Sequence, residues 1–159
     1  MKTILAPIDF SATTPFVVEE AIQLARATAA RLVLLHVVPP LALGSGEAEL
    51  AESGAGLESR AESDASRRLA ELQQSLRVDG VVAHAVLRRG PAGPSIVRQA
   101  DRLLADYIVI GSHGHTAFYD LIVGSTTTRV LKEATCRVVI VPPGVKASRK
   151  QRTAVRRTG

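Results

Sequence analysis

The chain has 159 residues, of which 46% are hydrophobic and 22% charged, a composition typical of one soluble globular domain. No apolar stretch approaches the ~20 residues of a membrane-spanning helix, and no signal-peptide pattern precedes the first strand-like segment, so we expect a cytoplasmic location. The single cysteine, Cys136, excludes an internal disulfide and is expected to pack as a small buried hydrophobe.

The net charge of +5 is unevenly distributed. Residues 146–159 carry six Lys and Arg and no acidic residue, so the rest of the chain has a net charge of −1. We therefore predict one domain over residues 1–144, without a basic nucleic-acid-binding surface, and a basic, disordered tail over residues 145–159. The tail is either a solubilising extension or a weak binder of nucleic acid or anionic lipid.

Short apolar runs alternate with helical patterns from the N-terminus onward. Residues 3–8 predict a first strand, and a helix follows with Thr14 as its N-cap and Pro15 at its first position. Residues 32–38 are apolar at nearly every position, as in a strand covered on both faces of a parallel sheet. The apolar face of the intervening helix comprises Val18, Ala21, Ile22, Ala25 and Ala29.

Residues 41–57 are rich in Gly, Ala, Ser and Glu, which predicts a mobile loop or lid. A second helix should then end at Asp79-Gly80, before a third strand over residues 81–87. The expected apolar positions of that helix are Ala61, Ala65, Leu69, Leu72 and Leu76.

The last part of the chain continues the alternation. Pro94-Ser95 should open a third helix that carries Ile96, Val97, Ala100 and Leu104. Residues 107–110 predict a fourth strand, residues 125–134 a fourth helix, and residues 137–141 a fifth strand before Pro142-Pro143.

This order predicts an α/β fold with an open parallel five-stranded sheet and helices on both faces. Such sheets bind ligands at the carboxyl ends of their strands, where the strand order reverses. The candidate site should therefore include Asp9 after the first strand, residues 36–38 at the end of the second, and Gly111 at the end of the fourth.

Glycine spacing after the fourth strand suggests an anion site. Gly111 and Gly114 would permit a sharp turn and a close approach of a ligand to the backbone. Gly124-Ser125-Thr126 begins a helix, whose free amides and positive dipole end favour a phosphate. The alternative is that the first two glycines only form a turn and that Ser125 only caps a helix. Neither the GxGxxG fingerprint nor a P-loop is present.

The chain resembles the universal stress protein family over Lys2 to Pro142. Nucleotide-binding members carry G-x2-G-x9-G-[ST], which here is Gly111, Gly114 and, after nine residues, Gly124-Ser125. The segments ILAPIDFS and LLHVV also resemble family signatures. The resemblance implies a flavodoxin-like, Rossmann-like sheet of order 3-2-1-4-5 and an ATP-binding regulatory protein in stress adaptation or signalling.

The resemblance also assigns roles around the nucleotide. Asp9 would meet the ribose or the adenosine side, Ala6 and Pro7 would flank the base, and the Val37 backbone would bond the adenine edge. Gly111 and Gly114 would line the ribose and the phosphates, and Gly124, Ser125 and Thr126 would hold the β and γ phosphates.

One departure from the family pattern concerns His115, because many binders carry Lys or Arg just after the second glycine. A mostly neutral imidazole would leave the phosphates to backbone amides and to Mg²⁺ or Mn²⁺ held mainly by the phosphates themselves. His113, His115 and Asp120 form too weak a pattern to predict a protein metal site. His36 and His84 are expected to serve strand packing.

Other functions remain open at this point. Hydrolysis needs a base near the γ-phosphate, and only Asp9 is placed near the site, so a binder is favoured over a slow ATPase or nucleotidyl-transfer enzyme. A protein-interaction module without nucleotide is the third hypothesis. Because the fifth strand should lie at a sheet edge, and because family members commonly dimerise there, a homodimer through Arg137 to Val141 is expected.

Overall fold

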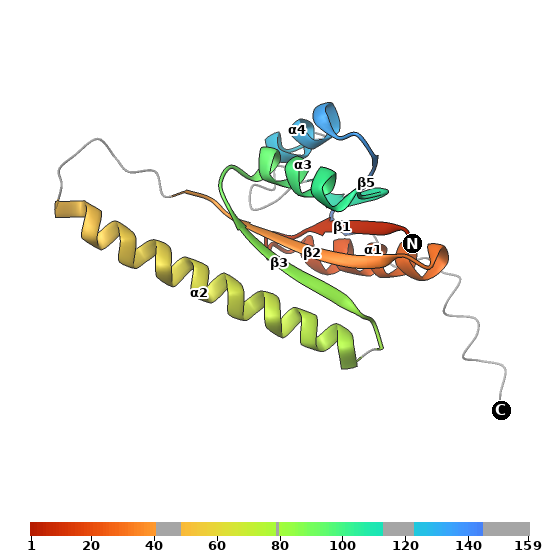
Figure 1. Ribbon diagram of the computed structural model, residues 1–159, viewed down its shortest axis with the longest axis horizontal. Helices are drawn as coiled ribbons and strands as arrows, with labels where there is room; N and C mark the ends of the chain where they lie inside the picture. The colour runs from red at the N-terminus through yellow and green to blue at the C-terminus, as the bar shows by residue number, and fades with distance from the viewer. Residues whose placement is uncertain (41–48, 79, 113–122, 145–159) are drawn as a thin grey trace.

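The computed structural model describes residues 1–40, 49–78, 80–112 and 123–144. Strands and helices alternate along the chain, as predicted (Figure 1). Their bounds are β1 (Thr3–Pro7), α1 (Thr14–Thr28), β2 (Arg31–Val38), α2 (Glu49–Val78), β3 (Ala83–Arg89), α3 (Ala92–Leu103), β4 (Tyr107–Gly111), α4 (Ser125–Glu133) and β5 (Arg137–Val141).

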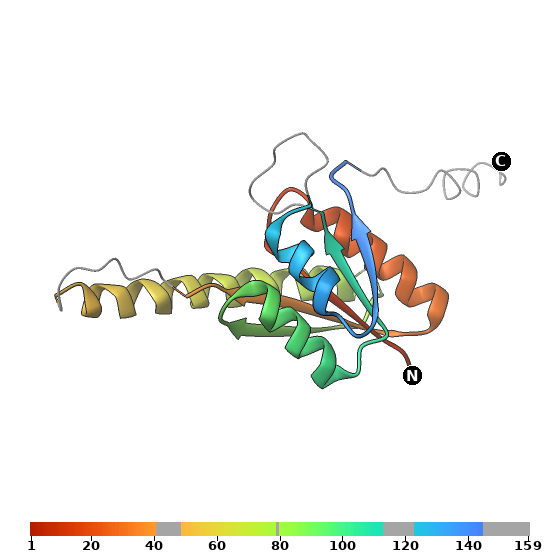
Figure 2. The same ribbon diagram turned by 90° about the horizontal axis from the view of Figure 1, so that it is seen from above.

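The five strands form one parallel sheet of order β3-β2-β1-β4-β5, which confirms the predicted fold class and strand order. Helices α1 and α2 cover one face of the sheet, and α3 and α4 cover the other (Figures 1 and 2). Helix α1 therefore leaves β1 toward one face while α4 leaves β4 toward the opposite face. The neighbouring strands β1 and β4 flank the point where the strand order reverses.

The core is divided by the sheet into two apolar clusters. Along β1, Ile4 and Ala6 pack in the cluster beneath α1 and α2, and Leu5 packs in the cluster beneath α3 and α4. All three side chains are fully buried. Residues that alternate between two covered faces explain why the central strands are apolar at successive positions.

Helix α2 begins at Glu49, so the prediction of a loop over residues 41–57 is wrong for its second part. Strong helix formers dominate residues 49–64, and a glycine inside a helix costs only about 1 kcal/mol relative to alanine, so Gly54 and Gly56 do not interrupt the helix. The buried Ala65, Leu69 and Leu76 anchor its second half on the sheet. Residues 41–48 lie outside the described part, and a lid there stays a prediction.

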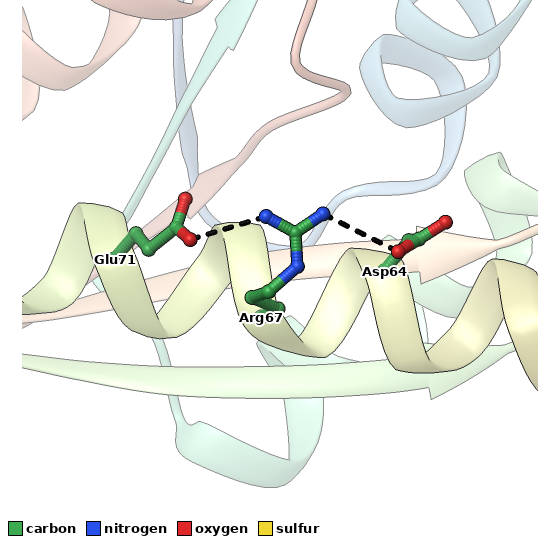
Figure 3. Close-up of polar contacts among 3 residues, drawn as sticks. All are labelled: Asp64, Arg67 and Glu71. Carbon is green, nitrogen blue, oxygen red and sulfur yellow. Dashed lines mark hydrogen bonds and ion pairs between the residues drawn. The ribbon is translucent and has the colours of Figure 1, made fainter.

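The first half of α2 projects beyond the sheet (Figures 1 and 2). Surface ion pairs lie along the described part of the helix: Arg67 pairs with Asp64 at 3.3 Å and with Glu71 at 3.2 Å (Figure 3). These two carboxylates raise the pKa of the Arg67 guanidinium. Exposed helix pairs of this kind contribute little to stability, because water and salt screen them.

Several predicted boundaries shift by one or two residues. Thr13, not Thr14, is the N-cap of α1, so Pro15 stands at the second helical position. Strand β3 starts at Ala83, where pairing with β2 begins, and Val82 before it is 76% exposed. Helix α3 starts earlier than Pro94, with Pro91 as its N-cap.

Two residues predicted on apolar helix faces lie beyond their helices. Ala29 and Leu104 adopt left-handed conformations as the C-caps of α1 and α3, with φ values of 50° and 49°. Leu104 is consequently 84% exposed. The spacing of apolar residues cannot indicate where a helix ends in a left-handed residue, because an apolar residue just beyond the helix can still fit the helical spacing.

Three further predictions concern single residues and the tail. Cys136 is half-buried against the cluster beneath α3 and α4, and burial raises the pKa of its thiol. His84, expected to pack, is exposed on the edge strand β3. Residues 145–159 lie outside the described part, and in the described part no helix is both long and apolar enough to span a bilayer.

Leu34 provides a test of the core. It is fully buried in β2 beneath α1 and α2, so Leu34→Ala should lower the free energy of unfolding by about 3 kcal/mol through lost burial and the cavity left behind. Val82→Ala, at an exposed position, should change it by less than about 0.5 kcal/mol. Urea denaturation of both variants measures the difference, and equal effects would contradict this core.

Candidate functional site

A cavity of about 290 Å³ opens at the carboxyl edge of the sheet, between the ends of β1 and β4. Its walls come from the β1–α1 loop, the end of β2, and the first turns of α1, α3 and α4. This is the place where the strand order reverses, so the location predicted from topology is occupied by a real hollow. We refer to this cavity as the crevice.

Asp9 lies in the β1–α1 loop at one wall of the crevice. Its Oδ1 accepts a hydrogen bond from the Ser11 amide at 2.9 Å and another from Thr14 Oγ1 at 3.4 Å. Aspartate commonly bonds the backbone two residues ahead in this way and thereby fixes a turn. The loop therefore leads into α1 with a defined shape.

The residues on either side of Asp9 are also held. The Ile8 amide donates to the Leu35 carbonyl at 2.8 Å, and the Ile8 carbonyl accepts from His36 Nδ1 at 2.8 Å. Phe10 has a φ of 60°, which is uncommon for a bulky residue, and the centroid of its ring lies 4.6 Å from that of the His36 ring. His36 thus has the satisfied, half-buried environment expected of a packing histidine.

Val37 presents backbone groups at the crevice. The Leu35 carbonyl accepts from the Ile8 amide just after β1, and the Val38 carbonyl accepts from the Gly90 amide just after β3. Successive residues of β2 direct their backbone groups to alternate sides of the strand, so the amide and carbonyl of Val37 point toward the β1 side. Strand β1 has already ended at Pro7. No described residue is recorded as a hydrogen-bond partner for either Val37 group, which leaves a donor and an acceptor for a ligand edge.

The first turn of α4 supplies amides at the other end of the crevice. The Gly124 amide donates to the Ser112 carbonyl at 2.9 Å, and Thr127 Oγ1 donates to the Gly111 carbonyl at 2.8 Å. These bonds fix the helix start against the end of β4. Among the described residues, no acceptor is recorded for the amides of Ser125, Thr126 and Thr127, which form the positive end of the helix dipole.

The first turn of α1 is different, although it lies in the same crevice. The Thr13 amide donates to Ser11 Oγ at 3.3 Å and the Thr14 amide to the Ser11 carbonyl at 3.1 Å, while Pro15 has no amide hydrogen. The loop itself thus satisfies this helix start. Of the N-termini of α1 and α4, that of α4 is the one with amides left for an anion.

The crevice is lined by both apolar and polar groups. Leu35, Val37, Ala92 and Ile96 are apolar lining residues, and Ser125 and Thr126 contribute hydroxyl groups. Asp9 is the only ionisable side chain among the described residues that line it. The lining suits a ligand that carries both a flat apolar ring and an anion.

Most of the sequence-predicted site residues meet at the crevice. Pro7, Asp9, Val37, Gly111, Gly124, Ser125 and Thr126 all line it. Ala6 does not line it, because its side chain is fully buried in the core beneath α1 and α2. The Gly124 amide is bonded to Ser112, so this glycine shapes the helix start and leaves the donor role to the next residues. Gly114 and His115 lie outside the described residues.

Sequence reasoning missed part of the lining. Thr13, Thr14, Ala92, Ile96 and Thr127 line the crevice as well. The segment Gly90-Pro91-Ala92-Gly93-Pro94 was the available signal, because in a parallel sheet the loop after β3 must also reach the carboxyl edge. The buried threonines had no such signal, since their position depends on how α1 and α4 pack.

The weak metal pattern in the sequence falls outside the described residues, because it consists of His113, His115 and Asp120. Among the residues that the structure does describe, no three His, Cys, Asp or Glu side chains come together as a metal site would require.

Comparison with known proteins places the chain in a family. Residues 1–142 match the model of the universal stress protein family. Universal stress protein A homolog 1 of Coxiella burnetii is 34% identical over 142 residues, which cover 88% of this chain and 95% of that protein.

Solved structures agree in fold. That of UspA from Lactobacillus plantarum is 25% identical with a TM-score of 0.77, over 88% of this chain and 97% of its own. A universal stress protein in complex with cAMP is 24% identical with a TM-score of 0.64, over 90% of this chain and 98% of its own. Family model, sequence relative and fold agree, and this chain therefore belongs to the universal stress protein family.

Proposed function

We propose that this protein binds ATP in the crevice and acts in stress adaptation or signalling as a nucleotide-dependent regulatory dimer. The observation that carries the proposal is the pairing of two backbone sites at one hollow. The Val37 amide and carbonyl suit the edge of an adenine ring, and the amides of Ser125, Thr126 and Thr127 suit a phosphate. Asp9 also lines the crevice, and we assign it to the ribose.

The family supports an adenine nucleotide as the ligand. One universal stress protein of the same fold has been solved with cAMP, which contains the same adenine ring and ribose. Because Asp9 is the only ionisable side chain on the described lining, Mg²⁺ or Mn²⁺ would be held mainly by the phosphates. Isothermal titration with ATP, together with mass spectrometry of small molecules that copurify, tests the binding itself.

Ser125→Asp tests the phosphate end. An aspartate at the first helical position would accept hydrogen bonds from the free amides and place a negative charge where the phosphate should lie. We expect ATP affinity to fall by about 10-fold or more, with adenosine affinity unchanged and thermal stability equal or higher.

Ser59→Asp on α2 is the matched control, because Ser59 is exposed and does not line the crevice. It adds the same charge and should leave ATP affinity unchanged. If Ser125→Asp binds ATP as tightly as the wild type, the phosphate does not sit at α4.

Hydrolysis is the main competing activity. A catalytic base would have to orient water at the γ-phosphate, yet Asp9 already accepts hydrogen bonds from Ser11 and Thr14 beside α1. We therefore expect phosphate release from ATP to remain at the level of buffer alone. Turnover that is above this level and is lost in Asp9→Asn would make the protein a slow ATPase instead.

The dimer is proposed through the free edge of β5. The Arg137 amide bonds the Asp106 carbonyl, and the Val141 carbonyl accepts from the Ser112 amide, so residues 137, 139 and 141 bond β4. By alternation, the backbone groups of Val138 and Ile140 face away from the sheet. An edge of this kind can pair with the same edge of a second copy.

Ile140→Pro tests that edge without breaking the sheet, because it removes an outward amide. Light scattering should show twice the 16.9 kDa chain mass for the wild type and a folded monomer for the variant. Val139→Pro should instead lower stability, since the amide of Val139 faces β4. A folded Ile140→Pro variant that stays dimeric would place the interface elsewhere.

A further inference from the structure

Phe10 does not line the crevice, yet its backbone is among the most unusual in the described chain. A φ of 60° is rarely adopted by a large side chain, and here it occurs directly after Asp9. Strained backbone of this kind persists only where the surroundings enforce it, and it clusters at functional sites. The contacts around Phe10 therefore indicate what enforces the shape of the β1–α1 loop.

The Phe10 ring is held between two other elements of the fold. The Arg68 guanidinium of α2 lies over the ring at 4.3 Å from its centroid, a distance suited to a cation–π contact. The His36 ring of β2 lies 4.6 Å from the Phe10 ring with an interplanar angle of 42°. We call Arg68, Phe10 and His36 the stack.

The stack also connects to the residue on the other side of Asp9. His36 Nδ1 donates to the Ile8 carbonyl at 2.8 Å, and the Ile8 amide donates to the Leu35 carbonyl at the same distance. Asp9 thus stands between one residue pinned to β2 and another clamped by α2 and β2. Neither of these neighbours gives the carboxylate much freedom to move.

We propose that Phe10 is a positioning residue, and that the stack holds the β1–α1 loop so that Asp9 stays on the crevice wall. This inference rests on the proposed nucleotide site and concerns the contacts that shape it before a ligand binds. The stack extends beyond the crevice, because Arg68 lies on the exposed surface of α2. Whatever shifts α2 at Arg68 would then change the affinity of the crevice.

The first measurement concerns the loop without any ligand. Amide hydrogen exchange at residues 9–14 should accelerate at least about tenfold in Phe10→Ala and less in Arg68→Ala, while the first turn of α4 stays unchanged. Phe10→Tyr keeps an aromatic ring and should restore wild-type exchange. Unchanged exchange in Phe10→Ala would overturn the proposal, and so would equal acceleration throughout the domain.

The second measurement separates positioning from general damage. Phe10→Ala should weaken ATP binding by about tenfold, but inorganic tripolyphosphate, which has no ribose and needs only the α4 amides, should bind within about twofold of wild type. Equal loss for both probes would overturn the positioning role, as would unchanged ATP affinity. Arg68→Ala, at an exposed position, keeps the test valid if Phe10→Ala folds poorly.

Arg67→Ala is the matched control for Arg68→Ala. It removes the neighbouring guanidinium and two exposed ion pairs of α2 but leaves the stack intact (Figure 3). Its exchange at residues 9–14 and its ATP affinity should equal those of the wild type, and a loss equal to that of Arg68→Ala would overturn the proposal. If the wild-type protein binds no ATP, the proposed function fails, while the exchange measurement still decides whether the stack holds the loop.

Discussion

The early end of β1 is the constraint on which the rest of the site depends. Strand β2 continues to Val38 while its neighbour β1 stops at Pro7, so backbone groups at Val37 lose the partner that the sheet would otherwise supply. Buried or half-buried backbone groups need hydrogen bonds, and a ligand edge can provide them. The same early end lets α1 and α4 diverge to opposite faces of the sheet, which opens the crevice between them.

The N-termini of α1, α3 and α4 lie at this opening, and the sequence makes those of α1 and α4 unequal. Ser11 supplies two acceptors to the start of α1, and Pro15 removes an amide that would otherwise need one. The start of α4 has Gly124 in place of a capping side chain, so among the described residues no side chain caps the next three amides. The start of α4, unlike that of α1, therefore offers amides to the proposed anion, which would be held there by dipoles because no Lys or Arg is found on the described lining. Binding that uses amides in place of cationic side chains should depend only weakly on salt.

Much of this arrangement could be predicted from residue patterns, because each pattern reports a local requirement. Two covered sheet faces require apolar runs, and these located all five strands. The predicted start of α4 at Ser125 is confirmed, because a glycine followed by hydroxyl residues is a local signal of a helix start.

Features that depend on packing could not be found in the same way. Ala6 lies next to Pro7 in sequence but points into the core, since alternation along β1 sends it to the face beneath α1 and α2. The sequence did not predict the start of α2, because Gly54 and Gly56 are typical of a loop and only the second half of the helix has an apolar pattern.

The stack of Arg68, Phe10 and His36 shows most clearly why the remainder required a structure. Its three residues come from α2, the β1–α1 loop and β2, and no spacing in the sequence connects them. Each contact is weak alone, with an exposed cation–π contact contributing about 0.5–1 kcal/mol. Their joint effect is to offset a left-handed backbone that costs about 1–3 kcal/mol, so losing any one of them should loosen the loop, and losing Phe10 should loosen it most. A nucleotide that engages Asp9 would stabilise the same loop, and by thermodynamic reciprocity it would also stabilise the position of Arg68 on α2. The exposed helix and the crevice are therefore two ends of one physical coupling.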